Sequence, residues 1–514
     1  MKKLYYNGYI ITMNGCKVVN GVVVEDGKID IVGNFSDVDK IPDDAVVKID
    51  LKGRTMMPAF IDAHSHITGV ASTMSLLDLN GTKSHAEVLE RIDEFKSTRG
   101  LDDSAWIVGW GYDHNDYEGK KQLSSTLLDS FSNPIMLTHK SGHVGVFNTR
   151  AKELLEIEGD RDGYLEEQAF MDAVKGVPRP SFSDMQAALR EAEKIYIKNG
   201  ITTVQDGLSH YADVELLAKT PLDVDVVSYI DYKEKDAILE KYGDYMREYI
   251  GNYKIGGYKV ILDGSPQART AWLSKPYSGE DSFRGTPYYS DERLEGIVKE
   301  VVGEGTQLLA HCNGDQASEQ FLVAYYHALN DMHIEPETRP VMIHAQTLRA
   351  DQIKRMAQTD MIPSFFVSHI YHFGDIHAVN LGMNRAKAIS PVRSAIDFGL
   401  PFTLHQDSPV LPPNMIEVID CAVNRVTKGG LHLGVYEKVE TYEALEGITA
   451  NAAYQYFEES TKGTIEEGKN ADFVILSDNI YECPKDKIKD IKVLATIKNG
   501  KTLYKDDTLD IDLK

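Results

Sequence analysis

Short apolar segments alternate with helical segments through the centre of the chain, and this alternation restricts the possible folds more than any other feature. Strands separated by helices run parallel, because each helical crossover returns the chain to the same edge of the sheet. Eight such strands suit a closed (β/α)8 barrel of the TIM type, an α/β fold. The predicted strands are 57–63, 201–206, 224–230, 257–262, 307–312, 340–345, 362–367 and 401–406.

Both ends of the chain have the pattern of β-structure. Asn7-Gly8 and Asp26-Gly27 stand between apolar runs, which predicts two tight hairpin turns near the N-terminus. Near the C-terminus, residues 471–478 and 493–505 are predicted strands, and the second folds back at Asn499-Gly500. We expect the two ends to form one small domain; two separate β extensions are the alternative.

A long segment separates the first two predicted strands. A structureless connection of about 135 residues is uncommon in a compact domain, so this segment is interpreted as a structured insertion. We predict a barrel of residues 54–459, an insertion at about 70–180 that covers the barrel mouth, and a small β-sandwich of residues 1–53 with 460–514. The insertion contains a predicted helix at 84–95 and strand-like runs at 106–111 and 135–139.

The helix that follows the insertion has recognisable ends. Residues 181–200 have helical periodicity, and Ser183 and Gln186 have the spacing of a capping box. Gly200 is placed to end the helix.

The composition excludes several classes of protein. The formal net charge is −24, which argues against nucleic acid or an anionic membrane as a main partner. The four cysteines form no Cys-x-x-Cys pair, so neither a disulfide framework nor a thiolate metal site is expected. The N-terminus lacks the apolar core of a signal peptide, and no apolar run approaches the length of a membrane span. We therefore expect a cytoplasmic protein that acts on a small molecule.

Histidine and aspartate residues follow several of the predicted strands. His64 and His66 come directly after the first strand, and residues two apart on a strand share a face. His311, His344 and Asp407 lie at the ends of three further strands. The carboxyl ends of barrel strands converge on one site, so these side chains can meet there. Nitrogen and carboxylate ligands without thiolate suit zinc, with manganese, iron or nickel as alternatives.

Lys259 lies among apolar residues inside the predicted strand 257–262. Burial lowers the pKa of an amine, and a neutral amine can take up carbon dioxide to become an anionic carbamate. Such a carbamate has two oxygens that could bridge a pair of metals. The alternative is a lysine that reaches solvent or an acidic partner.

These residues carry a resemblance to a known family. The chain resembles the amidohydrolase superfamily, in particular the amidohydrolase family 3 (YtcJ-like) branch, which includes N-substituted formamide deformylase. The resemblance extends over nearly the whole chain. The matching segments are MPAFIDAHSH (57–66), WIVGWGYDHN (106–115), HVGVFN (143–148), GITTVQD (200–206), GYKVILDGSPQARTAW (257–272), HCNGD (311–315), IHAQ (343–346), QDSPV (406–410) and GTIEEGKNADFVIL (463–476).

The resemblance implies a role for each matching site residue. One metal would be bound by His64, His66 and Asp407, and a second by His311 and His344. Lys259, carbamylated, would bridge the two. Asp407 would also act as general base and then as general acid. The resemblance further suggests a homodimer.

The chain departs from the branch at three places beside the implied pocket. Ile343 stands where the branch commonly has Glu, and His405-Gln406 precede Asp407 where Gly-Ser is common. The segment 364–375 differs from the usual Gln-Pro sequence. None of these changes removes an implied ligand, so they bear on the substrate. Candidate substrate contacts are His143, Tyr112, Arg269 and His369, although Arg269 could instead pair with Asp263.

Three functions remain open from the sequence. The first is cleavage of an amide or formamide-like C–N bond by a metal-activated water, in the class of hydrolases that act on carbon–nitrogen bonds other than peptide bonds. The second is a deaminase or cyclic amidohydrolase that acts on a nitrogen heterocycle; Lys259 argues against the mononuclear deaminases of the superfamily, which do not need this lysine. The third is a non-catalytic binding relative, which would ordinarily have lost metal ligands.

Overall fold

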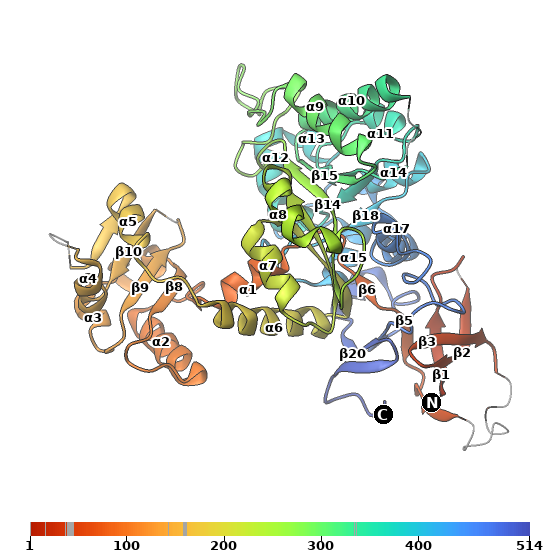
Figure 1. The fold of residues 1–514 in the computed structure, drawn as a ribbon, viewed down its shortest axis with the longest axis horizontal. Coiled ribbons are helices and arrows are strands. Elements are labelled where there is room, and N and C mark those ends of the chain that lie inside the picture. The colour runs from red at the N-terminus through yellow and green to blue at the C-terminus, as the bar shows by residue number, and fades with distance from the viewer. Residues whose placement is uncertain are drawn as a thin grey trace. The chain divides into compact units, whose positions relative to one another are not determined.

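The computed structural model describes residues 2–15, 17–35, 38, 46–141, 143–157, 162–333, 335 and 337–513. The chain divides into two compact units, drawn as a ribbon in Figure 1. The first unit comprises Met1–Thr68 with Glu193–Lys514, and the second comprises Gly69–Ala192. The expected insertion at about 70–180 falls within the second unit. No helix in the described part of the chain has the length and hydrophobicity that a membrane crossing requires.

The first unit contains a curled parallel sheet. In the described ranges it has eight strands, and each neighbouring pair is parallel. All eight correspond to predicted strands, and most are buried along their whole length because helices cover them. In sheet order the strands are β18 (Thr403–Leu404), β17 (Ile362–Phe365), β16 (Val341–His344), β15 (Gln307–Cys312), β14 (Tyr253–Ile261), β13 (Asp225–Asp231), β12 (Ile201–Ser209) and β6 (Phe60–Ile61).

The two edge strands of this sheet lead into segments that meet. The backbone N–H of Asp407, beyond β18, donates to the carbonyl of His64, beyond β6, over 3.1 Å. The N–H of His66 donates to the carbonyl of Ser408 over 2.8 Å. The ends of the first and last strands therefore lie side by side.

Helices connect the strands and surround the sheet in Figure 1. For example, α9 and α10 pack on each other and on β15. The helices of this unit are α7 (Tyr211–Lys219), α8 (Lys235–Tyr242), α9 (Asp291–Gly303), α10 (Asp315–Met332), α11 (Ala350–Met356), α12 (His369–Leu381), α13 (Met383–Ala386), α14 (Val392–Asp397), α15 (Met415–Asn424), α16 (Thr441–Gly447) and α17 (Ala450–Gln455).

A second sheet of the first unit joins both ends of the chain. Among the described residues it has eight strands, and its centre is the antiparallel pair β5 and β19. One buried apolar cluster contains residues from both termini, such as Tyr5 and Phe473, so the two ends share a core. The strands are β1 (Lys3–Ile11), β2 (Val18–Glu25), β3 (Lys28–Gly33), β4 (Val47–Asp50), β5 (Thr55–Pro58), β19 (Phe473–Leu476), β20 (Val493–Lys498) and β21 (Lys501–Lys505).

The second unit has its own sheet and core. Its sheet has five strands in the described ranges, in the order β11-β10-β9-β8-β7, and Ile107, Ile135 and Leu137 lie in its buried core. Its strands are β7 (Leu77–Asp78), β8 (Ile107–Tyr112), β9 (Ile135–His139), β10 (Val144–Phe147) and β11 (Tyr164–Glu166). Its helices are α2 (His85–Arg99), α3 (Ser125–Leu128), α4 (Thr149–Leu155) and α5 (Glu167–Val174), and α1 (Ile67–Met74) and α6 (Phe182–Lys198) cross the boundaries between the units.

Three local predictions were wrong. Asn7-Gly8 forms no hairpin turn, because β1 continues through it as a bulge: residues before it pair with β4 and residues after it pair with β5. The predicted strand 57–63 is divided, and its first half belongs to the terminal sheet as part of β5. The capping box of α6 is formed by Ser181 and Asp184, whose side chains each accept the other's backbone N–H.

Candidate metal centre

The six proposed ligands all lie at the carboxyl ends of strands in the parallel sheet. His64 and His66 follow β6, and Asp407 follows β18. His344 is the last residue of β16. Lys259 and His311 lie in the last third of β14 and β15, and their neighbours in the register place them on adjacent strands. The sheet therefore brings residues from five strands or their ends to one edge, as expected for convergent strand ends.

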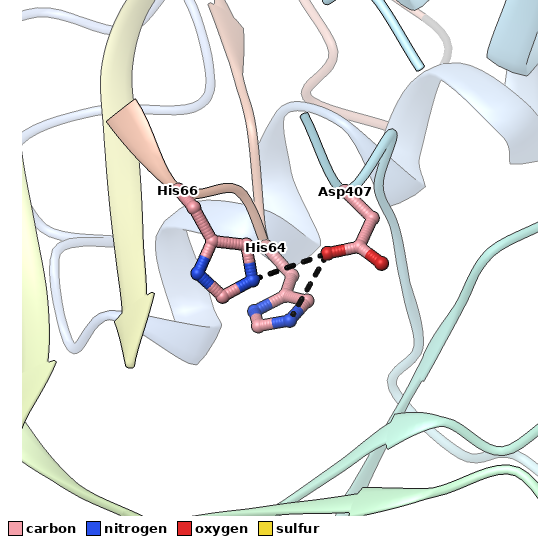
Figure 2. Close-up of side chains that lie close together, drawn as sticks. All are labelled: His64, His66 and Asp407. Atoms are coloured by element: carbon pink, nitrogen blue, oxygen red, sulfur yellow. Dashed lines mark ion pairs between the residues drawn. The ribbon is translucent and has the colours of Figure 1, made fainter. Parts of the chain in front are cut away.

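His64, His66 and Asp407 form the most compact part of this group (Figure 2). The Nε2 atoms of His64 and His66 lie 3.5 and 3.3 Å from Oδ1 of Asp407. The backbone of Asp407 has φ of 57°, in the left-handed region that side chains other than glycine rarely adopt. That conformation costs about 1–3 kcal/mol and persists only where the surroundings enforce it. Here the backbone hydrogen bond to His64 holds it.

Gln205 fixes which nitrogen of His64 faces the site. The side-chain N–H groups of Gln205 donate to the carbonyl of Ala63 and to the hydroxyl of Tyr456, so its Oε1 faces Nδ1 of His64 at 2.5 Å. Nδ1 must then carry the proton, which leaves Nε2 with a bare lone pair. Burial holds the pKa of His64 well below its usual range, so the ring is neutral.

A bare nitrogen that faces a carboxylate is an arrangement that needs a cation. Nε2 of His64 and the Asp407 carboxylate are both electron-rich, and at 3.5 Å they repel unless positive charge lies between them. Neutral imidazole nitrogens and a carboxylate oxygen are the donors that zinc and related divalent metals accept. The residues present therefore fit a divalent metal ion.

Lys259 is the buried amine of the group. Its Nζ lies 3.4 Å from Nε2 of His64, and only 2% of the residue is exposed. Burial lowers the pKa of Lys259 to about 7, against the opposing effect of the Asp407 charge. A substantial fraction of the amine is then neutral near pH 7, the form in which an amine can be carbamylated.

His344 and His311 complete the group on the neighbouring strands. Their rings are 4.6 Å apart edge to face, and Nε2 of His344 lies 3.9 Å from Oδ2 of Asp407. Burial holds the pKa of His344 well below its usual range. Nδ1 of His311 is buried, has no hydrogen-bond partner among the described residues, and lies 3.3 Å from a carboxylate oxygen of Asp263. The structure thus brings all six proposed ligands together.

The four candidate substrate contacts fall in different surroundings. His369 is buried near the group, its ring nearly parallel to that of His344 at 6.3 Å. Arg269 binds Glu280 over 2.8 Å, so the alternative pairing with Asp263 was wrong. In the second unit, His143 is exposed and lies 3.3 Å from Glu167. Tyr112 is fully buried in the core of that unit, where it packs between apolar side chains, and this burial argues against a substrate contact.

Four residues that support the group were not predicted. Gln205 orients His64, and Asp263 accepts the backbone N–H groups of Trp272, Asn313 and Gly314. His405 contacts His344, and Gly207 leaves the space that the His64 ring fills. One signal in the sequence was available: polar Gln205 and His405 stand near the ends of apolar strands, where a buried polar side chain needs a partner.

A second cluster of metal-ligating residue types lies in the second unit. The ligand atoms of Asp113, His114 and His139 lie within 4.8 Å of one another. However, Lys140 pairs with the Asp113 carboxylate, and the backbone N–H of Ser141 donates to Nδ1 of His139. Nε2 of His139 then carries the proton and donates to Asp113. Asp113 and His139 are therefore paired with each other and with their neighbours, while Nδ1 of His114 is buried with no hydrogen-bond partner among the described residues.

The sequence profile of the amidohydrolase family matches residues 48–504. Over 546 residues the chain is 27% identical to YtcJ of Bacillus subtilis (strain 168), which is named as an amidohydrolase; the match covers 98% of this chain and 99% of that protein. It is 24% identical to the N-substituted formamide deformylase of Arthrobacter pascens, over 96% of this chain and 95% of that enzyme. Among solved structures, an uncharacterized metal-dependent hydrolase of Pyrococcus furiosus superposes with a TM-score of 0.77 at 25% identity, covering 94% of this chain and 100% of that one.

Proposed function

Because the chain belongs to the amidohydrolase family of metal-dependent hydrolases, we propose that it hydrolyses an amide or N-substituted formamide bond of a small molecule. The similarity to N-substituted formamide deformylase, which extends over nearly the full length of both chains, supports the choice of bond. Within the proposal, the parallel sheet is a closed (β/α)8 barrel, and the hydrogen bonds between the ends of β6 and β18 support its closure.

One observation carries the proposal: the Asp407 carboxylate lies within 3.9 Å of the Nε2 atoms of His64, His66 and His344 at the carboxyl ends of the strands. His64, His66 and Asp407 would hold one divalent metal, and His311 with His344 a second, both most simply zinc. Lys259, as a carbamate, would lie between them. A bound metal would supply polarisation of the carbonyl and activation of water.

The chain's own residues would handle the proton. Asp407 is the carboxylate at the centre of the group, and in the proposal it accepts a proton from the attacking water and delivers it to the leaving nitrogen. The new C–O bond replaces the C–N bond, and the products are a carboxylate, formate for a formamide, and an amine. Gln205 keeps the His64 lone pair directed at the site throughout.

The test is amine release from a panel of N-substituted formamides and N-acyl amides, with protein loaded with zinc or manganese in the presence of bicarbonate. We expect turnover of at least one member, and a loss of about 100-fold or more in Asp407→Asn. Asp510→Asn is the matched control, because that side chain is 98% exposed and pairs only with Lys52 among the described residues. Ammonia release from nitrogen heterocycles would indicate the deaminase alternative instead. A metal-loaded protein that releases neither amine nor ammonia would contradict the proposal.

Three further features of the enzyme belong to the proposal: its location, its oligomeric state and the class of its substrate. We propose that it acts in the cytoplasm as a homodimer. The acidic net charge of −24 supports a small-molecule substrate over a nucleic acid.

A further inference from the structure

His405 lies next to the candidate metal centre but is not one of the six proposed ligands. It follows β18, is fully buried, and packs its ring 5.2 Å from the rings of both His64 and His344. Its Nε2 lies 3.2 Å from Nδ1 of His344, and its Nδ1 lies 2.8 Å from the hydroxyl of Ser364 on β17. Ser364, His405 and His344 therefore form a continuous hydrogen-bonded row across three adjacent strands.

The row can carry its protons in only two orders, because a neutral imidazole has one N–H and one lone pair. In the first order, Nδ1 of His344 donates to His405, and Nδ1 of His405 donates to Ser364. In the second, Ser364 donates to His405, and Nε2 of His405 donates to His344. The number of protons is the same in both orders.

The two orders present opposite groups to the metal centre. The first leaves Nε2 of His344 with a bare lone pair, 3.9 Å from Asp407. The second places an N–H there, which could donate to the Asp407 carboxylate but could not bind a cation. Polar atoms also lie on the far side of two other rings of the group: Oε1 of Gln205 is 2.5 Å from Nδ1 of His64, and a carboxylate oxygen of Asp263 is 3.3 Å from Nδ1 of His311.

We propose that His405, backed by Ser364, is a positioning residue that holds the Nδ1–H tautomer of His344 and so directs its Nε2 lone pair at the second metal. This inference rests on the proposed metal centre and deepens it. A polar partner on the far nitrogen of a metal-binding histidine sets its tautomer and orientation, and loss of such a partner weakens metal binding about 10- to 100-fold.

The test compares two substitutions of similar size. In His405→Leu the acceptor is lost, whereas in His405→Gln an amide oxygen can still accept from Nδ1 of His344. We expect His405→Leu to weaken binding of the second zinc ion about 10- to 100-fold, measured by competition with a chromophoric chelator, and His405→Gln to recover most of that affinity. The thermal unfolding of each metal-free variant shows whether it folds, and catalytic activity is not needed for the readout.

Each possible result supports or overturns the proposed role of His405. Wild-type zinc affinity in His405→Leu would overturn the proposal, and so would an equal loss in both variants, since packing alone would then explain it. If His405→Leu does not fold, Ser364→Ala decides: we expect a smaller loss of zinc affinity in the same direction, and no change would overturn the proposal. His377→Asn is the control for changing a buried histidine outside the row. A wild-type protein that binds no zinc would overturn the proposed function as well, whereas unchanged variants beside a zinc-binding wild type would overturn only the role of His405.

Discussion

Gly207 is the position at which one added carbon atom would perturb the candidate metal centre most directly. It lies in β12, where a Cβ atom would stand 2.3 Å from Cε1 and 2.6 Å from Nδ1 of His64. Two carbon atoms in ordinary contact are about 3.5 Å apart, so Gly207→Ala requires the imidazole to retreat by about 1.2 Å. The hydrogen bond of 2.5 Å between His64 and Gln205 cannot persist through such a shift.

The displacement should affect binding and catalysis more than the fold. Loss of the Gln205 contact predicts a fall of about 10- to 100-fold in metal affinity. A misplacement of about 1 Å at a catalytic centre predicts a further loss of about 100-fold in kcat/KM with metal in excess. The backbone of Gly207 is not in the left-handed region, so the clash itself, rather than backbone strain, is the cause.

The assay is a zinc titration of Gly207→Ala together with kcat/KM on the substrate that the panel identifies. Gly296→Ala is the matched control, because Gly296 lies in α9 and a Cβ there would meet no atom within 4 Å. Wild-type zinc affinity in Gly207→Ala, or an equal loss in the control, would refute the reasoning that places the His64 ring against Gly207.

Three further predictions concern separate parts of the first unit and its boundary helix. Lys259→Met, which cannot form a carbamate, should lose about 100-fold or more in turnover and any dependence on bicarbonate; wild-type turnover would contradict the bridging role. Burial alone would raise the pKa of Glu458, but Lys462 and Lys254 outweigh burial and lower it to about 2. The contribution of ionised Glu458 to stability is therefore present above the unfolded pKa of about 4.3 and is lost as pH falls towards 2. Glu458→Gln should lower the free energy of unfolding by about 3 kcal/mol at pH 7 and by less at pH 3, as measured by denaturant titration. Ser181→Ala, which removes the cap of α6, should lower the free energy of unfolding by about 1 kcal/mol, and no change would contradict the cap.

The strands of the parallel sheet were predictable because they are buried on both faces and appear as short apolar runs. The prediction for 307–312 coincides with β15. The predictions were wrong where one sequence pattern is compatible with two different structures. Asn7-Gly8 has turn chemistry, but β1 uses the left-handed conformation of Asn7 to change partners within one strand. The run 57–63 is apolar except for Asp62, because two different sheets bury it in succession.

The proposed ligands could be predicted because each stands where a strand ends, and strand ends converge. Their supporting residues could not, because His405 and Asp263 act through contacts between strands that are distant in the sequence. The surroundings of Tyr112 could not be predicted for a related reason. An aromatic side chain in an insertion could face a substrate or a local core, and only the fold of the second unit shows that it lies in the core.

We propose that the clustered histidines, Asp407 and Lys259 hold a pair of metal ions. The most direct measurement is metal content per chain by plasma mass spectrometry, on protein purified without chelator and supplied with bicarbonate. We expect about two divalent metal ions per chain, and about one in His311→Ala, which keeps the His64, His66 and Asp407 group intact. A chain that binds no metal, even after zinc or manganese is added, would contradict the proposed metal pair.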